Sequence, residues 1–376
     1  MAKKCYVGVD GVACKVKKGY VGVDGVARKI KRAYIGIGGV ARPCWSGGEL
    51  AYYGQITPLL DARWYMAATS VGNYALFGGG RRPADSAGTP LVEAYSSDLV
   101  NTRPDYLSES KLYVSATTVG NYALFGGGYA SRKQTSSVNA YSSSLVRSTP
   151  TSLAIACYQL AATTVGSYAL FGGGRTNSGW VAGMSTYDSS LTRATNQSLS
   201  VARSELVATS ASGYAIFGGG NASGTASNVV DAFDSSLTRK TPTVLSTARN
   251  QFAATSVGNY ALFGGGHTGS ATTTKVDAYN ASLTRSTPTA LSAARSCLAA
   301  TSVGEYALFG GGFGSDGIVK SNVVDVYDTS LTRTKLTTNL GLAEHSAATV
   351  GRFALFAGGV NSNGEESSVV HAFTIA

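Results

Sequence analysis

Short apolar segments separated by glycine, serine and threonine recur from residue 67 to the end of the chain. Each reads Tyr-Ala-Leu-Phe-Gly-Gly-Gly or a close variant, and the aromatic residue before the glycines stands at Phe77, Phe125, Phe171, Phe217, Phe263, Phe309 and Phe356. Successive spacings are 48, 46, 46, 46, 46 and 47 residues. Self-similarity at such a period is typical of repeat architectures. We therefore predict seven structural units of nearly equal length.

Within each unit the pattern predicts four strands. A segment of Ala, Ser and Thr leads through Val-Gly-Asn into the apolar segment, and segments such as "VDAFDSSLTR" and "TPTALSAAR" follow. Four extended segments separated by turn residues predict a four-stranded antiparallel blade. The second strand is apolar on both faces, as expected when a neighbour covers each face. Close to the axis only small side chains fit. The fold class is therefore all-β, a seven-bladed β-propeller.

The ends of the chain predict how the ring closes. The last unit stops at "SSVVHAFTIA", which matches a third strand, and residues 49–60, "ELAYYGQITPLL", end like the fourth strands elsewhere. We expect the amino-terminal strand to complete the seventh blade.

These units resemble the kelch repeat over residues 49–376. The resemblance rests on the paired glycines, on a Tyr such as Tyr95 after them, and on the Leu-x-x-Ala-Arg turn seen at Leu291–Arg295. It implies a kelch-like propeller with seven blades. The kelch Trp is absent, and Ala194, Lys240 and Ser286 stand in its place.

Differences between the units fall on two of the four connections. The first-to-second and third-to-fourth connections are nearly constant, whereas the second-to-third and fourth-to-first connections change in length and chemistry. In a propeller these two variable sets lie on one face of the disc. In aligning the fourth-to-first connections we match Glu344-His345-Ser346 of the last unit to Arg63-Trp64-Tyr65 of the first.

The variable connections carry aromatic and basic residues, which are enriched at binding hot spots. Variation could also be the drift of unconstrained loops, but loops on a rigid scaffold are where binding function usually lies. We favour a recognition face. Its candidate binding residues are Trp64, Tyr65, Arg81, Arg82, Tyr113, Tyr129, Arg132, Lys133, Tyr158, Arg175, Trp180, His267 and Phe313.

The repeated arginines form a separate set on the constant side. Pairing with nearby Asp or turn carbonyls is the favoured role, and a docking ring for an acidic partner is the alternative. These residues are Arg147, Arg193, Arg239, Arg285 and Arg333.

Residues 1–45 hold a shorter repeat and form a separate module before the propeller, which we assign to residues 46–376. Tyr6, Tyr20 and Tyr34 recur every 14 residues, each before a turn pair such as Asp10-Gly11. Such pairs between apolar stretches predict tight β-hairpins. The register pairs Val9 with Val12, Val7 with Cys14 and Cys5 with Val16, so Cys5 and Cys14 are not opposed.

The charge of the chain is concentrated in this arm. Of 31 Lys and Arg and 21 Asp and Glu, the arm holds ten and two, a net +8, which leaves 21 and 19, a net +2, for the rest. Isolated hairpins are marginal in water, so the three hairpins should need each other, the propeller or other chains. Its candidate assembly residues are Tyr6, Lys17, Lys18, Tyr20, Arg28, Lys31, Arg32, Tyr34 and Arg42.

The hairpin repeats resemble amino-terminal repeats of structural and tail-associated proteins of bacteriophages. That resemblance implies an arm that docks into a virion. A flexible basic tail and a nucleic-acid-binding arm are alternatives, since Lys and Arg neutralise phosphates. A hairpin pattern is more ordered than a phosphate-binding tail requires, so nucleic acid is the less favoured partner.

Catalytic and metal signatures are weak. Three histidines, His267, His345 and His371, are too dispersed for a copper site, and Arg63, Arg203, Arg249 and Arg295 with Glu205 and Glu344 are a poor match to a sialidase site. We expect no cofactor and no metal. The chain start lacks a signal-peptide pattern, no apolar run would span a bilayer, and five cysteines without paired spacing suit a reducing compartment.

The sequence thus favours a non-enzymatic phage virion protein of tail-fibre or baseplate type, made in the bacterial cytoplasm. The arm would dock with other virion proteins, the propeller face would bind a host-surface glycan or protein, and several copies or a homo-oligomer are expected. Two alternatives remain: a capsid decoration or neck protein with a passive propeller, and an intracellular kelch adaptor.

Overall fold

The computed structural model describes residues 48–82, 88–195 and 197–375 with their side chains, and the backbone of six strands within residues 6–45. All regular structure in these parts is β-strand. No helix there is long and apolar enough to cross a membrane.

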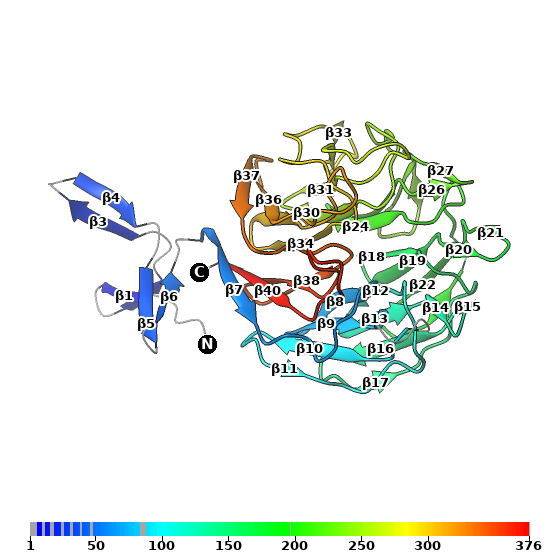
Figure 1. Ribbon diagram of the computed structural model, residues 1–376, viewed down its shortest axis with the longest axis horizontal. Helices are drawn as coiled ribbons and strands as arrows, with labels where there is room; N and C mark the ends of the chain where they lie inside the picture. The colour runs from blue at the N-terminus through cyan, green and yellow to red at the C-terminus, as the bar shows by residue number, and fades with distance from the viewer. Residues whose placement is uncertain are drawn as a thin grey trace.

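Seven four-stranded antiparallel sheets form the blades of a β-propeller, in agreement with the sequence (Figure 1). The innermost strands of blades one to seven are β8 (Ala67–Val71), β12 (Ser115–Val119), β18 (Ala161–Val165), β24 (Val207–Ala211), β30 (Ala253–Val257), β34 (Ala299–Val303) and β38 (Ser346–Val350). The second strands are β9 (Tyr74–Gly78), β13 (Tyr122–Gly126), β19 (Tyr168–Gly172), β25 (Tyr214–Gly218), β31 (Tyr260–Gly264), β35 (Tyr306–Gly310) and β39 (Phe353–Ala357).

The third strands are β10 (Val92–Ser96), β16 (Val138–Ser142), β22 (Met184–Tyr187), β28 (Val230–Phe233), β32 (Val276–Tyr279), β36 (Val323–Asp328) and β40 (Val370–Ile375). The outermost strands are β11 (Asn101–Thr102), β17 (Arg147–Ser148), β23 (Arg193–Ala194), β29 (Arg239–Lys240), β33 (Arg285–Ser286), β37 (Arg333–Thr337) and β7 (Leu50–Ile56). Three blades also carry a two-stranded hairpin after the glycines: β14 (Tyr129–Ala130) with β15 (Lys133–Gln134), β20 (Arg175–Thr176) with β21 (Gly179–Trp180), and β26 (Asn221–Ala222) with β27 (Thr225–Ala226).

The ring is closed by the strand that precedes the first blade. β7 pairs antiparallel with β40, so that Val370 lies opposite Ile56 and Ile375 opposite Leu50. Figure 1 shows this blue strand beside the red end of the chain. Each innermost strand contacts the next around the axis, and β38 returns to β8. The predicted closure is therefore confirmed.

Apolar cores fill the spaces between blades, one at each of the seven interfaces. Between blades one and two, Leu76 and Val92 pack against Phe125 and Tyr141. The glycine that ends the second strand is required here, since a Cβ on Gly78 would lie 2.7 Å from the Phe125 ring. Close approach of neighbouring sheets is thus what fixes the first glycine of the run.

Hydroxyl groups join the innermost strands to one another. Thr69 and Thr118 meet at 2.8 Å between their Oγ1 atoms, and Thr301 and Thr349 do the same. Small side chains fit the crowded axis, as predicted, and their hydroxyls satisfy neighbouring backbone carbonyls such as that of Ser302.

The outermost strands are shorter than the sequence predicted. Five of them have only two residues and begin at the Arg or Asn that we placed at the end of the third segment. Proline follows closely in four of these blades, at Pro104, Pro150, Pro242 and Pro288. Proline cannot donate to a ladder, so pairing stops there. Blade six has no such proline, and its strand β37 reaches Thr337.

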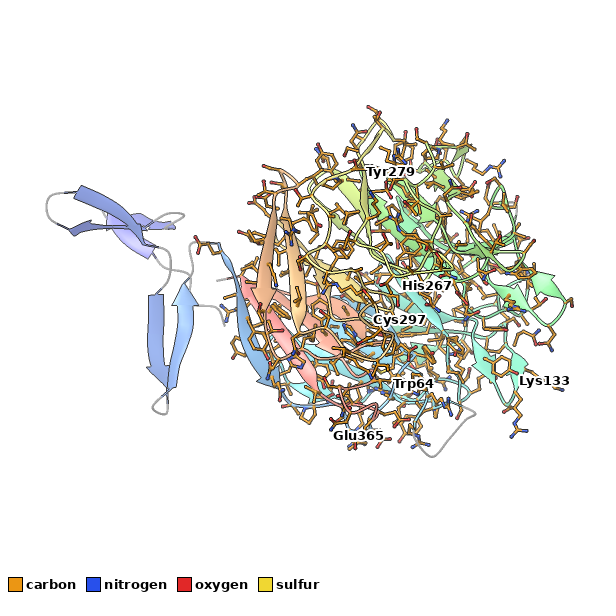
Figure 2. The ribbon with its side chains drawn as sticks, turned by 45° about the horizontal axis from the view of Figure 1, so that its top comes forward. Trp64, Lys133, His267, Tyr279, Cys297 and Glu365 are labelled. Carbon is orange, nitrogen blue, oxygen red and sulfur yellow. The ribbon has the colours of Figure 1, made fainter. Side chains whose placement is uncertain are left out.

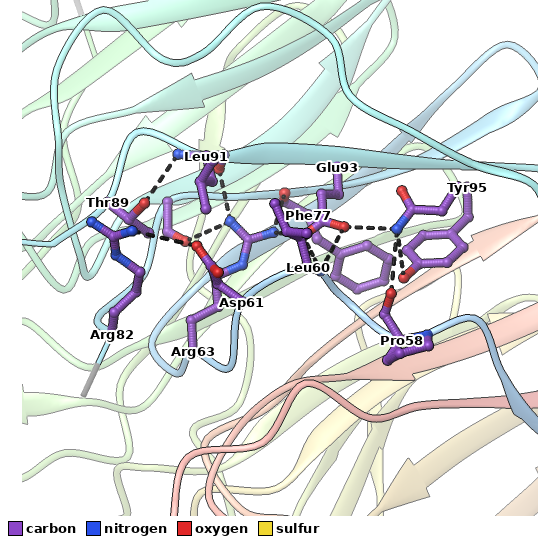
Figure 3. Close-up of polar contacts among 12 residues, drawn as sticks. Pro58, Leu60, Asp61, Arg63, Phe77, Arg82, Thr89, Leu91, Glu93 and Tyr95 are labelled. Carbon is purple, nitrogen blue, oxygen red and sulfur yellow. Dashed lines mark hydrogen bonds and ion pairs between the residues drawn. The ribbon is translucent and has the colours of Figure 1, made fainter. Parts of the chain in front are cut away.

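Arginine and acid pairs are buried inside four blades. Arg63 is fully buried and its Nη2 lies 3.0 Å from Glu93 Oε1 (Figure 3). Glu93 also accepts the backbone N–H of Leu60 at 3.1 Å, so the acid holds the turn that carries the arginine. The equivalent pairs are Arg203 with Asp231, Arg249 with Asp277, and Arg295 with Asp325.

Where a blade lacks the arginine it also lacks the acid. Blade two has Lys111 and Asn139, and the ammonium donates to Ser137 instead. Blade three has Cys157 and Ser185, with the serine Oγ accepting the N–H of Ala154. A cavity of about 200 Å³ opens beside these two shorter side chains. In blade three both charged partners are replaced, as expected because an unpaired buried charge is costly.

The repeated arginines on the outermost strands have structural partners. Arg333 Nη1 donates to Asp325 Oδ1 at 2.8 Å, and Arg193 and Arg285 donate to the carbonyls of Ser152 and Val244. Pairing with an Asp or with turn carbonyls is the structural role that we favoured from the sequence.

The arm backbone forms three hairpins: β1 (Tyr6–Val9) with β2 (Val12–Lys15), β3 (Gly19–Val23) with β4 (Val26–Ile30), and β5 (Ala33–Ile37) with β6 (Val40–Trp45). Val9 pairs with Val12 and Val7 with Cys14, as predicted from the turn at residues 10–11. The predicted pairing of Cys5 with Val16 lies outside the described residues.

The buried pairs give a testable prediction for blade five. Arg249→Cys or Asp277→Ser alone leaves a buried charge without its partner and should cost about 3–5 kcal/mol of unfolding free energy. The double variant copies blade three and should cost less than the sum, by about 1–3 kcal/mol. Urea unfolding of the four proteins measures this coupling; additive costs would contradict the pairing.

His345 gives a second prediction, on acid stability. It is buried where the other blades have Met66, Val114, Leu160, Leu206, Phe252 or Leu298, and burial lowers its pKa to about 3. The unfolded chain, with a His pKa near 6.5, binds this proton more readily, so stability falls as the pH drops below about 6.5. At pH 5, His345→Leu should gain on the order of 2 kcal/mol from this source. If the unfolding free energies of the two proteins differed by the same amount at every pH from 8 to 5, this role of His345 would be refuted.

Candidate binding face

The two variable sets of connections meet on one face of the disc. In every blade, a residue just before the innermost strand forms an isolated antiparallel bridge with the residue after the glycines. The seven bridges are Trp64↔Arg81, Leu112↔Tyr129, Tyr158↔Arg175, Ser204↔Asn221, Asn250↔His267, Ser296↔Phe313 and Ala343↔Val360. We call the surface formed by these connections the varied face.

Seven equivalent residues surround the axis on this face, and we call them the axial ring. Each lies two residues before an innermost strand and has φ between 52° and 56°. Backbone N–H groups donate from one member to the next, as from Cys297 to the Gln251 carbonyl at 2.8 Å. The members are Tyr65, Tyr113, Gln159, Glu205, Gln251, Cys297 and Glu344. The backbone is therefore uniform while the side chains differ.

Aromatic rings occupy the part of the varied face that belongs to blades one to three. Trp64 and Tyr65 stack with centroids 4.4 Å apart, and Tyr65 lies 4.3 Å from Tyr113. Tyr158 then contacts Tyr113 at 6.1 Å and Tyr129 at 5.3 Å. All five side chains are half-buried. We call this chain of rings the aromatic ladder.

Arginines flank the ladder. The Arg81 guanidinium lies 5.3 Å from the Trp64 ring centroid, and that of Arg175 lies 5.1 Å from the Trp180 ring. Figure 2 labels His267 and Cys297 near the middle of the disc and Trp64 below them. Cations over aromatic rings keep these rings in fixed orientations.

Two carboxylates occupy the other part of the axial ring. Glu344 Oε1 accepts the Tyr65 hydroxyl at 2.7 Å, and Glu205 accepts from the amides of Gln159 at 3.2 Å and Asn250 at 3.0 Å. Burial raises the pKa of both carboxyls. Burial and these nearby carboxylates raise the pKa of Cys297 to about 12. The Cys297 thiol is therefore protonated at neutral pH and is a weak nucleophile.

The remaining predicted residues lie on the varied face but away from the ladder. Arg132 and Lys133 are exposed at the tip of the β14–β15 hairpin, and Figure 2 places Lys133 at the edge of the disc. Phe313 lies 5.2 Å from the Lys320 ammonium. His267 accepts the N–H of Gly269, and Arg82 pairs with Asp61 at 3.4 Å.

The alignment of the seventh unit was wrong by two residues. Leu342-Ala343-Glu344, and not Glu344-His345-Ser346, stand where the first unit has Arg63-Trp64-Tyr65, as the bridge Ala343↔Val360 shows. The connection before blade seven lacks the usual Ala-Arg ending, which hid the register. We therefore missed the axial ring in the sequence. Its other six members are the third residues of the three-residue segments that follow Leu-x-x-Ala (Leu-x-x-Ser in the second unit) in the first six units.

The residues considered for catalysis do not converge. Arg63, Arg203, Arg249 and Arg295 are fully buried in their own blades and bind acids there. Within the described residues no group of three or more His, Cys, Asp and Glu could hold a metal ion. The arrangement offers rings, guanidinium groups and carboxylates on a rigid surface, which suits binding.

The assembly residues of the arm are only partly covered by the structure. The backbone of Tyr6, Tyr20, Arg28, Tyr34 and Arg42 lies in hairpin strands. Lys17, Lys18, Lys31 and Arg32 lie outside the described residues.

Neither a scan of protein-family models nor a search of curated proteins found a match to this chain.

The contact between Tyr65 and Glu344 gives a prediction for the site. The hydroxyl stabilises the ionised carboxylate, so Tyr65→Phe should raise the pKa of Glu344 further, because burial then acts without this hydrogen bond. Carboxyl ¹³C titration of the labelled protein measures the change. Tyr129→Phe is the control and should leave Glu344 unaltered. An unchanged Glu344 titration in Tyr65→Phe would contradict the contact.

Proposed function

We propose that the protein is a non-enzymatic bacteriophage virion component of the tail-fibre or baseplate type. Its varied face recognises a glycan or protein on the host surface, and its basic arm docks into the particle. The observation that carries the proposal is the half-buried aromatic ladder on the one face where the blades differ.

The ladder supports binding because its rings lie on the surface of the disc and outside its seven interblade cores. Trp and Tyr with flanking Arg are the side chains that dominate binding energy at interfaces. Rings with a polar handle also stack on the apolar faces of sugars while offering a hydrogen bond.

Unused donors support the same interpretation. Among the residues that the structure describes, none is a hydrogen-bond partner of the indole nitrogens of Trp64 and Trp180 or of Nε of Arg81. Buried donors in native proteins are nearly always paired, and those that are not call for an explanation such as a role in function. A ligand that shifts these side chains slightly would satisfy them.

The kelch-like assignment rests on the roles of the repeated residues. The repeated Tyr donates its hydroxyl to the connection of the preceding blade, as Tyr279 does to the Thr243 carbonyl at 2.8 Å and Tyr327 to the Thr289 carbonyl at 2.7 Å. Together with the glycines, this tyrosine supports a kelch-type repeat in which the Trp has been lost.

The arm supports attachment to a larger assembly. The arm has three short hairpins and a net charge of +8, and isolated hairpins are only marginally stable in water. Strands that are marginal alone are stabilised by pairing with other chains, which fits multi-copy incorporation beside other virion proteins.

Removal of the arm tests the docking part. A form that lacks residues 1–47 keeps β7, so it should fold as a closed propeller but be absent from purified virions by mass spectrometry. A form that lacks residues 1–57 also loses β7 and should melt at a lower temperature. Normal incorporation of the first form would overturn the docking role.

Truncation of ladder residues and of Trp180 tests recognition. Trp64→Ala, Tyr129→Ala and Trp180→Ala should each weaken binding in a glycan array or to host cells by about tenfold or more, as expected for hot-spot aromatics. Asn121→Ala and Asn259→Ala, exposed on the constant face, are matched controls. Incorporation without any binding would indicate a passive spacer instead.

A further inference from the structure

The seventh blade, like blades two and three, lacks the buried arginine and acid pair, and it has Leu342 and His371 at these positions. His371 is paired with Phe356 on the neighbouring strand of its sheet, as Glu93 is paired with Phe77 in blade one. Leu342 takes the place of Arg63. The Leu342 carbonyl accepts the N–H of Gly312, and the Arg63 carbonyl accepts the N–H of the equivalent Gly359. Blade seven therefore has neither the cation nor the acid that fills this space in blades one, four, five and six.

A groove of about 240 Å³ opens at this position between blades six and seven, on the varied face. Its lining includes the amides of Gln55, Asn322, Asn339, Asn361 and Asn363 together with the imidazole of His371. The volume is below the roughly 300–1,000 Å³ of drug-sized sites, which suits one small ligand unit.

His371 is almost completely buried, with 1% of its surface exposed, and it lines this groove. Its Nδ1 lies 2.9 Å from the Tyr52 hydroxyl, which donates its own proton to Asn339 Oδ1 at 2.6 Å. The hydroxyl has one proton, so it accepts from Nδ1–H. Burial lowers the pKa of His371 to about 4, so the ring is neutral and Nε2 is an acceptor. No residue in the described part of the chain bonds to that nitrogen.

The remaining groups fit a polyhydroxyl ligand. The side-chain amides of Gln55, Asn322 and Asn363 have no hydrogen bond to other described residues, and each offers both a donor and an acceptor. Leu340, Leu342 and Val369 supply an apolar wall. None of the lining side chains is charged, so a charged ligand would lose its hydration without compensation.

We propose that this groove binds a neutral saccharide unit, with His371 Nε2 accepting one hydroxyl and the free amides contacting its neighbours. The inference rests on the proposed function and names the ligand chemistry and a contact point separate from the aromatic ladder. Asn361 is a positioning residue, because its Oδ1 accepts the N–H groups of Asn363 and Glu365 and so shapes the loop.

Saturation-transfer NMR on the full-length protein tests the proposal with glucose, galactose, rhamnose, N-acetylglucosamine and N-acetylgalactosamine as probes. N-acetylneuraminic acid and glucosamine serve as charged comparisons, and glycerol as a simple polyol. At least one neutral sugar should receive saturation and shift the His371 imidazole nitrogens, whereas the charged sugars and glycerol should not.

Two sets of variants locate the binding. Asn322→Ala with Asn363→Ala removes exposed amides and should weaken binding at least tenfold without unfolding the protein. Leu342→Arg with His371→Asp rebuilds the pair found in blade six and should abolish binding by filling the groove. Trp64→Ala should leave it unchanged.

The outcomes separate this inference from the proposed function. Loss of sugar binding in Trp64→Ala but not in the groove variants would overturn the groove site and leave recognition by the ladder intact. Binding only of charged sugars, of glycerol or of none of the probes would also overturn it. If the protein binds a sugar at the groove but does not bind host cells, the proposed function is contradicted and the groove site is not.

Discussion

The structure depends on one constraint: each blade is apolar on both faces and must be covered on both. Only a closed ring satisfies this for all seven sheets at once, and the pairing of β7 with β40 provides the closure. The close contact of Gly78 with Phe125 shows how little freedom an interface has. Repeated residues are therefore committed to packing, to the buried arginine and acid pairs, and to turns. Most differences between blades lie in the connections, and a few, such as those at Cys157 and His371, lie at the buried pair.

The connections that differ gather on the varied face, where a uniform backbone carries different chemistry in each blade. Blades one to three present stacked rings with arginines, and Glu344 and Glu205 flank them in the axial ring. In blade seven the internal pair itself is replaced, and a polar groove opens where a guanidinium would otherwise lie. The scaffold thus separates stability from recognition, since side chains on this face can change without disturbing the interblade cores.

Much of the fold was predictable because spacing along the chain is a direct consequence of blade size. The regular positions of Phe77 to Phe356 predict seven blades, and the ending at "SSVVHAFTIA" predicts closure by an earlier strand. The same-face clustering of the variable connections was also predictable from topology alone. The pairing of Arg63 with Glu93 was not, because it joins residues from different segments whose contact depends on side-chain reach. The His371 groove was missed for a related reason: it arises from the absence of a pair, and the irregular connection before blade seven hid the register.

Hydrogen–deuterium exchange of the full-length protein bound to host-surface material is the most direct test of recognition by the varied face. The account predicts slower exchange in the connections that hold Trp64, Tyr113, Tyr158 and the loop at residues 361–366. It predicts no change in the turns at residues 72–73, 120–121 and 258–259 on the opposite face. Protection of those turns, or equal protection of both faces, would contradict it.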